Sequence, residues 1–323
     1  TFKLPLSTTY VAFMIAMGSS LADRAWGRET AVYRITGVMT VIGGWFITAG
    51  AAFMMAFLIA TLNNVGGFFA MVGVIGLIIF TMITNNRRFK KKQEQAENVD
   101  TLFRQMMSTR DKQETWSLLL QHCQLTEVHL IKSSREIFEG AAQGLMNDNI
   151  RTLRSAESLL KDEREMWKRY RRKEIIGMRK IDRLQAIEKD TWFYLGINSI
   201  SQILYGLKRM LEPILEHVDN NFSPLPDDFI NEYAPVVERT SKFLVDIQTA
   251  IENNDFSTSD EVLVNGSILK NEVSAIRHSL QDRIQQDESN LTVALLYLST
   301  LQETQEIISN ARHLLRAAKR FSS

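Results

Sequence analysis

The most apolar stretch of the chain, residues 36–84, contains no Asp, Glu, Lys, Arg or His. Asn63 and Asn64 divide this stretch into two uncharged runs, residues 36–62 and 65–84. Each run is long enough to cross a bilayer core of roughly 30 Å, which needs about 20 apolar residues. Neither run has the polar stripe that a helix on the surface of a soluble domain carries. The pattern therefore predicts a transmembrane helical hairpin rather than a very apolar soluble helix pair.

Basic residues flank the predicted hairpin at both ends. Arg28 and Arg34 precede the first run, and a cluster of Lys and Arg in residues 87–92 follows the second. Because Lys and Arg are enriched on the cytoplasmic side of membrane spans, we expect both ends to face the cytoplasm. The turn at Asn63 and Asn64 then faces out. We therefore expect a multi-pass protein of the inner (cytoplasmic) membrane, in contact with membrane lipids, with its C-terminal part in the cytoplasm.

From Gln93 onward the composition changes to segments rich in Glu, Gln, Lys and Arg. Apolar residues recur there at helical spacing, and the breaks between segments are rich in Asn, Asp, Ser and Pro. The predicted helices cover residues 111–147, 149–183, 190–220, 226–253, 259–286 and 290–320. Six long helices joined by short turns predict two three-helix bundles in series. The expected fold is all-α, with transmembrane helices in residues 1–92 and a cytoplasmic helical-bundle domain in residues 93–323.

The last predicted helix has the clearest apolar seam, with spacings that alternate between three and four. The seam consists of Ala294, Leu298, Leu301, Thr304, Ile308, Ala311, Leu315 and Ala318. Glu303, Glu306 and Arg312 lie off this seam.

Composition excludes some classes of protein. Of 323 residues, Cys123 is the only cysteine, which excludes an internal disulfide framework. No Ser/His/Asp, Cys/His or phosphate-loop pattern stands out, so we do not expect an enzyme. The run from Lys168 to Lys173 is strongly basic, but no nucleic-acid-reading module accompanies it, and no nucleic-acid partner is expected. The run either rests on anionic lipid or forms a solvated helix face paired with nearby Glu residues.

Three consecutive hydroxyl residues, Ser7, Thr8 and Thr9, follow Pro5 at the start of an apolar segment. Free backbone N–H groups and the positive dipole end at a helix N-terminus, together with such hydroxyls, can bind an anion. An ordinary Ser/Thr N-cap explains the same residues. The chain does not begin with Met, and we expect it to be a C-terminal piece of a longer protein.

Several blocks in residues 1–84 resemble, in order, the second repeat of the PiT inorganic phosphate transporters. They are Leu4-Pro5-Leu6-Ser7-Thr8-Thr9, Met17-Gly18, Asp23-Arg24, Arg34-Ile35-Thr36-Gly37 and Gly43-Gly44-Trp45. The resemblance implies a permease that couples phosphate to a cation, Na⁺ or H⁺, and whose phosphate ligands include Ser7, Thr8 and Thr9. Repeats that rock about a central site would give alternating access. A sulfate permease of the same family is an alternative.

The chain departs from the PiT pattern at two points. Tyr10 stands where many members have His, which puts any role of that His in doubt. The Gly-Ala-Asn-Asp signature that helps to bind phosphate and sodium in the family is absent from the 323 residues. We therefore expect only part of the site here, and no transport by these residues alone.

The C-terminal half resembles the PhoU-like regulatory domain fused to some PiT transporters, most closely in residues 211–221 and 297–306. Some PhoU proteins bind metal clusters through acidic helix motifs. Glu212, Glu216 and Asp219 lie near one another on a helix face and are candidate ligands of a divalent metal, although we favour a solvated acidic face before a helix end as the explanation. His122, Cys123 and His129 also suggest a metal site, but Cys123 is off the face shared by the two His, and we expect scattered core or surface residues.

Small residues recur at every fourth position through the first apolar run, a spacing that lets membrane helices pack closely. They are Thr36, Thr40, Gly44, Thr48, Ala52, Ala56 and Ala60. This stripe could face the rest of the transporter or a second protomer, and a homodimer is the expected assembly. The alternative to a transporter is a membrane-tethered helical signalling protein, which would need neither this stripe nor the hydroxyl triplet.

Overall fold

The computed structural model describes residues 44, 46–61, 64, 67, 73, 99–220, 222–286 and 291–323. The chain divides into two compact units, Thr1–Lys92 and Gln93–Ser323. All regular secondary structure in the described residues is helical, which confirms the all-α class for that part of the chain.

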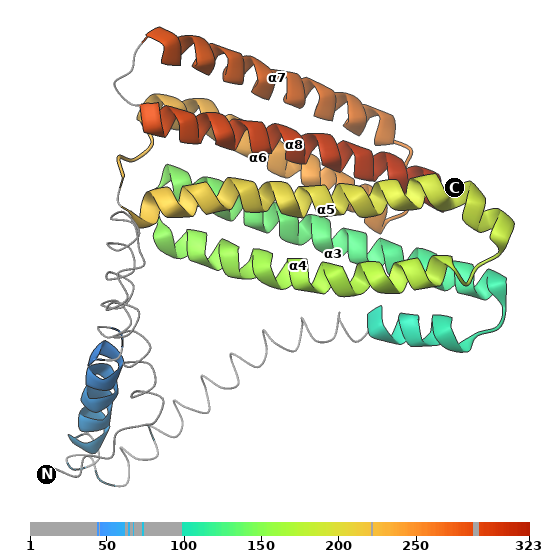
Figure 1. Cartoon of the computed structure of the whole chain (residues 1–323), viewed down its shortest axis with the longest axis horizontal. Coiled ribbons are helices and arrows are strands. Elements are labelled where there is room, and N and C mark those ends of the chain that lie inside the picture. The colour runs from blue at the N-terminus through green and yellow to red at the C-terminus, as the bar shows by residue number, and fades with distance from the viewer. Residues whose placement is uncertain are drawn as a thin grey trace, which may run out of the picture. The chain divides into compact units, whose positions relative to one another are not determined.

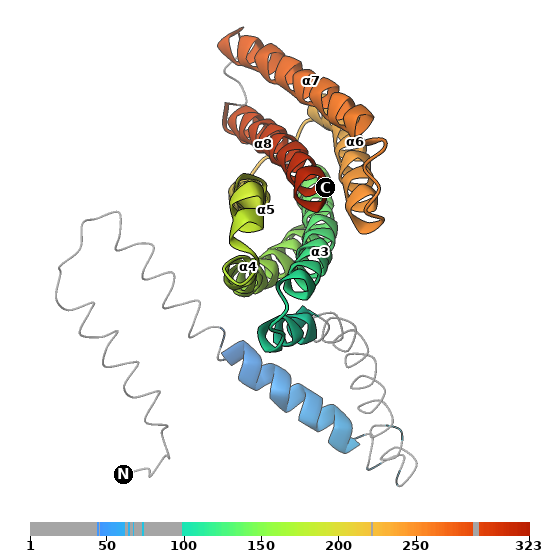
Figure 2. The ribbon, with the colours of Figure 1, turned by 90° about the vertical axis from the view of Figure 1, so that its right-hand side faces the viewer.

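The second unit is built from long antiparallel helices (Figure 1). They are α3 (Lys112–Met146), α4 (Ile150–Met178), α5 (Arg183–Asp219), α6 (Asp227–Glu252), α7 (Ser259–Gln286) and α8 (Leu291–Ser322). A further helical segment, residues 99–108, precedes α3. Helix α3 contacts α4, α5 and α6, whereas α8 contacts α5, α6 and α7. The most extensive interface joins α5 to α8, which lie side by side in Figure 2. One continuous core therefore connects the two groups of three helices.

Polar side chains fix where several helices begin and end. The side chains of Asp111, Asn149 and Asp182 accept hydrogen bonds from backbone N–H groups in the first turns of α3, α4 and α5, and these groups have no partner within the helix. Asp148 and Asn254 adopt positive φ angles of 47° and 50° in the turns after α3 and α6. Asp and Asn tolerate this left-handed conformation better than most residues, so the turns form where the sequence predicts breaks.

The predicted boundary between the second and third helices of the bundle was wrong. Helix α4 ends at Met178 rather than at residue 183, and α5 begins at Arg183 rather than at residue 190. The cause is the N-cap at Asp182, whose carboxylate accepts a hydrogen bond from the N–H of Leu184 at 3.1 Å. Asp182 is followed three residues later by Gln185, a capping-box spacing, but its neighbours continue the helical pattern and conceal the break.

The seam of α8 lies in the core, where Leu301, Ile308 and Leu315 are fully buried and Leu298 is partly buried. Glu303, which lies off the seam, is also buried. Helix α8 packs against three neighbours, so it needs a wider buried surface than a single seam provides.

Most of the predicted hairpin and all of its basic flanks lie outside the described residues. Residues 46–61 are helical, and their large apolar side chains are exposed, with Phe46 at 76% and Phe53 at 70%. No helix among the described residues reaches both the length and the apolar character needed to cross a membrane.

Candidate functional site

Two of the three predicted metal ligands, Glu212 and Asp219, form ion pairs with basic side chains. Near the C-terminal end of α5, a Glu212 carboxylate oxygen lies 3.1 Å from Lys208 Nζ. Asp219 accepts a hydrogen bond from Arg154 of α4 at 2.7 Å. Within the part of the chain that the structure describes, no group of three or more His, Cys, Asp or Glu side chains is placed to hold a metal ion. Glu216, the third predicted ligand, therefore belongs to no such group. The predicted phosphate ligands Ser7, Thr8 and Thr9 lie outside the described residues.

Two His–Glu pairs, one fully buried and one partly buried, join α3 to α4. Nδ1 of His122 lies 3.3 Å from a carboxylate oxygen of Glu174, and Nε2 of His129 lies 2.9 Å from one of Glu163. The two His are seven residues apart on α3, and they meet Glu residues eleven apart on the antiparallel α4. Glu163 and Glu174 are almost completely buried, so each carboxylate depends on these contacts in place of water.

Glu174 is the centre of the more deeply buried pair. The Thr126 hydroxyl donates a 2.6 Å hydrogen bond to the same Glu174 oxygen that faces His122. The His122 ring meets the Tyr170 ring edge-on, with centroids 6.0 Å apart, and its Nε2 atom is buried without a hydrogen-bond partner among the described residues. Burial, followed by the charges of neighbouring acids such as Asp100 and Glu163, raises the pKa of Tyr170 to about 12.

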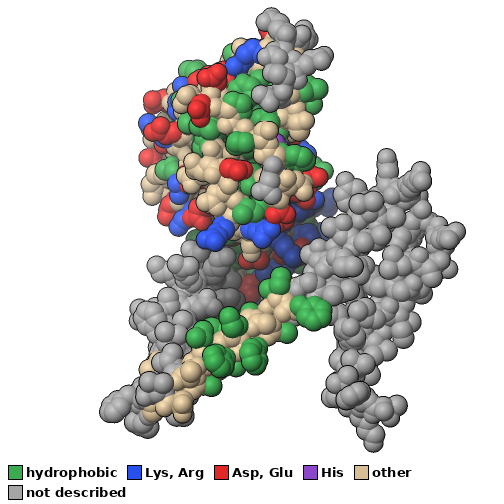
Figure 3. Space-filling view, turned by 90° about the vertical axis from the view of Figure 1, so that its left-hand side faces the viewer, with side chains coloured by type: hydrophobic (Ala, Val, Ile, Leu, Met, Phe, Trp, Pro, Cys, Tyr) green, Lys and Arg blue, Asp and Glu red, His purple; other side chains and the backbone are tan. Residues whose placement is uncertain are grey.

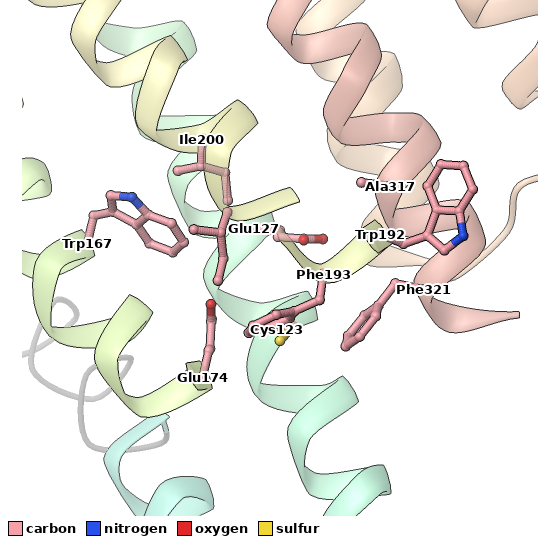
Figure 4. Close-up of a pocket in the computed structure, with 10 residues that line it drawn as sticks. Cys123, Glu127, Trp167, Glu174, Trp192, Phe193, Ile200, Ala317 and Phe321 are labelled. Carbon is pink, nitrogen blue, oxygen red and sulfur yellow. The ribbon is translucent and has the colours of Figure 1, made fainter. Parts of the chain in front are cut away.

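A cavity of about 10 Å³ adjoins this cluster, with room for no more than one water molecule. Glu127 of α3 and Glu174 of α4 reach into it, beside Cys123 and the aromatic rings of Trp167 and Phe193 (Figure 4). Desolvation, and then the charge of Glu174, raise the pKa of Glu127 to about 8, so that the carboxyl group is protonated near neutral pH. Desolvation raises the pKa of the Cys123 thiol as well. A buried protonated thiol is a poor nucleophile, and the cluster is better suited to hold protons than to attack a substrate.

A second, much larger hollow lies on another side of α4, between that helix and α5. It has a volume of about 500 Å³, within the range of small-molecule sites. Its described lining contains four basic residues and no acidic one. The lining residues are Arg164, Trp167, Lys168, Arg171, Arg172, Ile175, Ser201, Leu204 and Tyr205. We call this hollow the basic groove.

Comparisons with known proteins give no further guide to the site. The chain matches no family model, no curated protein and no solved structure.

Sequence reasoning missed both of these arrangements. It identified His122 and His129 as sharing a helix face, but it did not predict that Glu163 and Glu174 lie opposite them. The signal was present in α4, where Glu163, Trp167, Tyr170 and Glu174 recur at spacings of four, three and four and so face the core together. The basic run was noted, but only the packing of α5 beside α4 turns it into a groove.

Proposed function

We propose that the protein takes part in cation-coupled transport of inorganic phosphate across the cytoplasmic membrane, and that its helical bundle regulates this transport. The observation that carries the proposal is the ordered set of PiT-like blocks, from residues 4–9 to residues 43–45. Ser7, Thr8 and Thr9 would replace part of the water shell of the phosphate, and the coupled cation would offset its charge.

The first unit supports a membrane setting through one structural feature. The helical residues 46–61 are exposed throughout, and they include large apolar side chains such as Phe46, Met55 and Leu58. A helix that is apolar on all sides is stable only when other protein or lipid covers it. The proposal places lipid, or neighbouring helices of the transporter, on these side chains.

Radioactive phosphate uptake tests the proposal. The protein containing this chain is expressed in cells without phosphate uptake of their own, as wild type and as a Thr8→Val, Thr9→Val variant. Valine keeps the shape of threonine but removes the hydroxyl group, so uptake should be abolished at equal expression. Thr81→Val, a matched change in the second apolar run and outside the small-residue stripe, should retain uptake. Unchanged uptake in the double variant would refute the assignment of the site, and competition by excess sulfate would favour a sulfate permease.

A membrane-tethered regulatory protein is the second candidate, and the separation of the bundle as a compact unit with its own core favours it. In that case the wild-type protein would support no uptake, and the double variant would behave like the wild type in every assay.

A further inference from the structure

We propose that the basic groove between α4 and α5 binds an anion that carries more than one phosphate group. The inference concerns the bundle alone and does not depend on transport by the first unit. Its starting point is the register of α4. Arg164, Lys168, Arg171, Arg172 and Ile175 follow one another at helical spacing along one face, adjacent to the face that carries Glu163 and Glu174 into the core. Side chains of Lys and Arg are visible as a group along the lower edge of the bundle in Figure 3.

Three of the four basic side chains of the groove have no salt-bridge partner among the described residues. Lys168 pairs with Glu165 at 2.7 Å, and both side chains are more than 60% exposed. Among the described residues, no salt bridge involves Arg164, Arg171 or Arg172, although the bundle pairs many of its other cations. Like charges on neighbouring turns repel one another, so a bound anion would relieve this repulsion. Arginine presents a planar set of N–H donors that matches phosphate oxygens better than a point charge does.

The floor of the groove is rigid and has a polar group. Trp167 is buried at 5% exposure, and its indole N–H donates a 2.9 Å hydrogen bond to the Ser201 hydroxyl of α5. Ser201 in turn donates to the carbonyl of Ile197 at 2.7 Å. The first bond connects α4 to α5 at the base of the groove, and the second, within α5, fixes the orientation of the Ser201 hydroxyl. Tyr205, half-exposed, lines the α5 side of the groove, where its ring is covered by the Arg209 guanidinium at 4.6 Å.

The length of the cationic row defines the size of the ligand. Arg164 and Arg172 are eight residues apart, which corresponds to about 12 Å along the helix axis. A ligand with two or more phosphate groups can contact both ends of this row while the arginine side chains stay extended. An oligophosphate, or a phospholipid headgroup that carries two phosphate groups, has the required extent. Both are phosphate-bearing anions, and they differ in whether the ligand is free in solution or held in a lipid.

Calorimetric titration of the full 323-residue chain, in a neutral detergent and about 150 mM salt, tests the proposal. Tripolyphosphate represents the soluble source, and a short-chain cardiolipin, which carries two phosphate groups and is used as a monomer, represents the lipid source. Citrate is the control anion without phosphate. We expect one of the two phosphate probes to bind and citrate to bind at least tenfold more weakly, because the forked donors of arginine fit phosphate. Salt at this concentration screens unspecific attraction beyond about 8 Å.

Charge-neutralising variants show where the probe binds. Arg171→Gln with Arg172→Gln should weaken binding by about 100-fold, on the order of tenfold for each lost charged hydrogen bond. Arg169→Gln is the matched control, because Arg169 is an exposed arginine of the same helix that does not line the groove. It should change the affinity less than threefold. Equal thermal melting of all three proteins shows that the substitutions leave the fold intact.

Each outcome has one meaning. Tripolyphosphate binding that the double variant loses supports a soluble ligand, and cardiolipin binding that it loses supports a lipid headgroup. Three results would overturn the proposal: no binding of either probe, equal weakening by Arg169→Gln, or binding of a single-stranded oligonucleotide more tightly than either probe. The last result would replace the proposed ligand with nucleic acid.

Discussion

The Thr126 hydroxyl and the imidazole of His122 meet the same oxygen of Glu174, at 2.6 Å and 3.3 Å, in a part of the core that water does not reach. Both donors come from successive turns of α3, and the acceptor comes from α4. The two helices are therefore joined by a polar contact between buried groups, which have no access to bulk water as an alternative partner. Buried networks of this kind are costly to disrupt, because the group left behind keeps its desolvation penalty.

Thr126→Val should lower the free energy of unfolding by about 2 kcal/mol, because it removes a hydrogen bond to a buried carboxylate while keeping the shape of the side chain. Thr126→Ser retains the hydroxyl and should cost about 1 kcal/mol or less, the effect of one buried methyl group. Urea unfolding followed by circular dichroism measures both. Equal losses for the two variants would mean that the hydroxyl contributes nothing to stability.

The raised pKa of Glu127, about 8, predicts a pH dependence of stability. The folded protein keeps a proton on Glu127 that the unfolded chain releases above about pH 4.5. Between these two values the folded state binds more protons, so stability is highest at the acidic end and decreases as the pH rises towards 8. Glu127→Gln should remove this decrease. Relative to the wild type, the free energy of unfolding of the variant should then be on the order of 2 kcal/mol higher at pH 8 than at pH 5.

Denaturation midpoints measured at pH 5, 6.5 and 8 test this dependence. Glu165→Gln serves as the control, because Glu165 is exposed on α4 and its pKa is lowered by its hydrogen bond to Lys168. Its curve should follow that of the wild type across this range. A Glu127→Gln curve parallel to the wild-type curve would show that Glu127 ionises normally in the folded protein.

Gly144 of α3 packs directly against Leu153 of α4. A methyl group at this position would overlap the Leu153 side chain, so Gly144→Ala should lower the free energy of unfolding by about 2 kcal/mol. At Gly206 on α5, a methyl group would make an ordinary 3.4 Å contact with Ile307. Gly206→Ala should therefore stabilise the protein by about 0.5 kcal/mol through its better helix propensity. Thermal melting compares the two, and a gain in stability at Gly144 would contradict the close packing.

Arg209 of α5 binds Glu303 of α8 through two hydrogen bonds, at 2.9 and 2.7 Å. Arg209→Met should destabilise the bundle by about 2 kcal/mol, because the Glu303 carboxylate, 8% exposed, would remain buried without a cation. Arg209→Lys keeps the charge but loses the paired geometry, and it should cost roughly half as much. Chemical denaturation gives both values. If Arg209→Lys were as destabilising as Arg209→Met, geometry rather than charge would carry the interaction.

The sequence by itself determined the helices of the second unit. Their apolar periodicity and the Asn- and Asp-rich turns are local signals, because a helix and its caps depend on residues a few positions apart. These signals placed α7 at residues 259–286 and the other ends mostly within a few residues. They failed between α4 and α5, where the cap at Asp182 lies in a pattern that could continue as helix. The sequence also assigned Ser7, Thr8 and Thr9 to phosphate and Glu212, Glu216 and Asp219 to a metal, and these assignments remain predictions.

The tertiary structure decided which side chains share a site. His122 and Glu174 are 52 residues apart in the sequence, and only the antiparallel packing of α3 and α4 places them together. The same holds for Arg209 and Glu303, whose pairing follows from the extensive contact between α5 and α8. A basic face on one helix is equally compatible with solvent and with a ligand. Helix α5 packs beside α4 and contributes Ser201 and Tyr205 to the lining. The basic face of α4 thereby becomes one wall of a groove, because a groove needs walls from at least two elements.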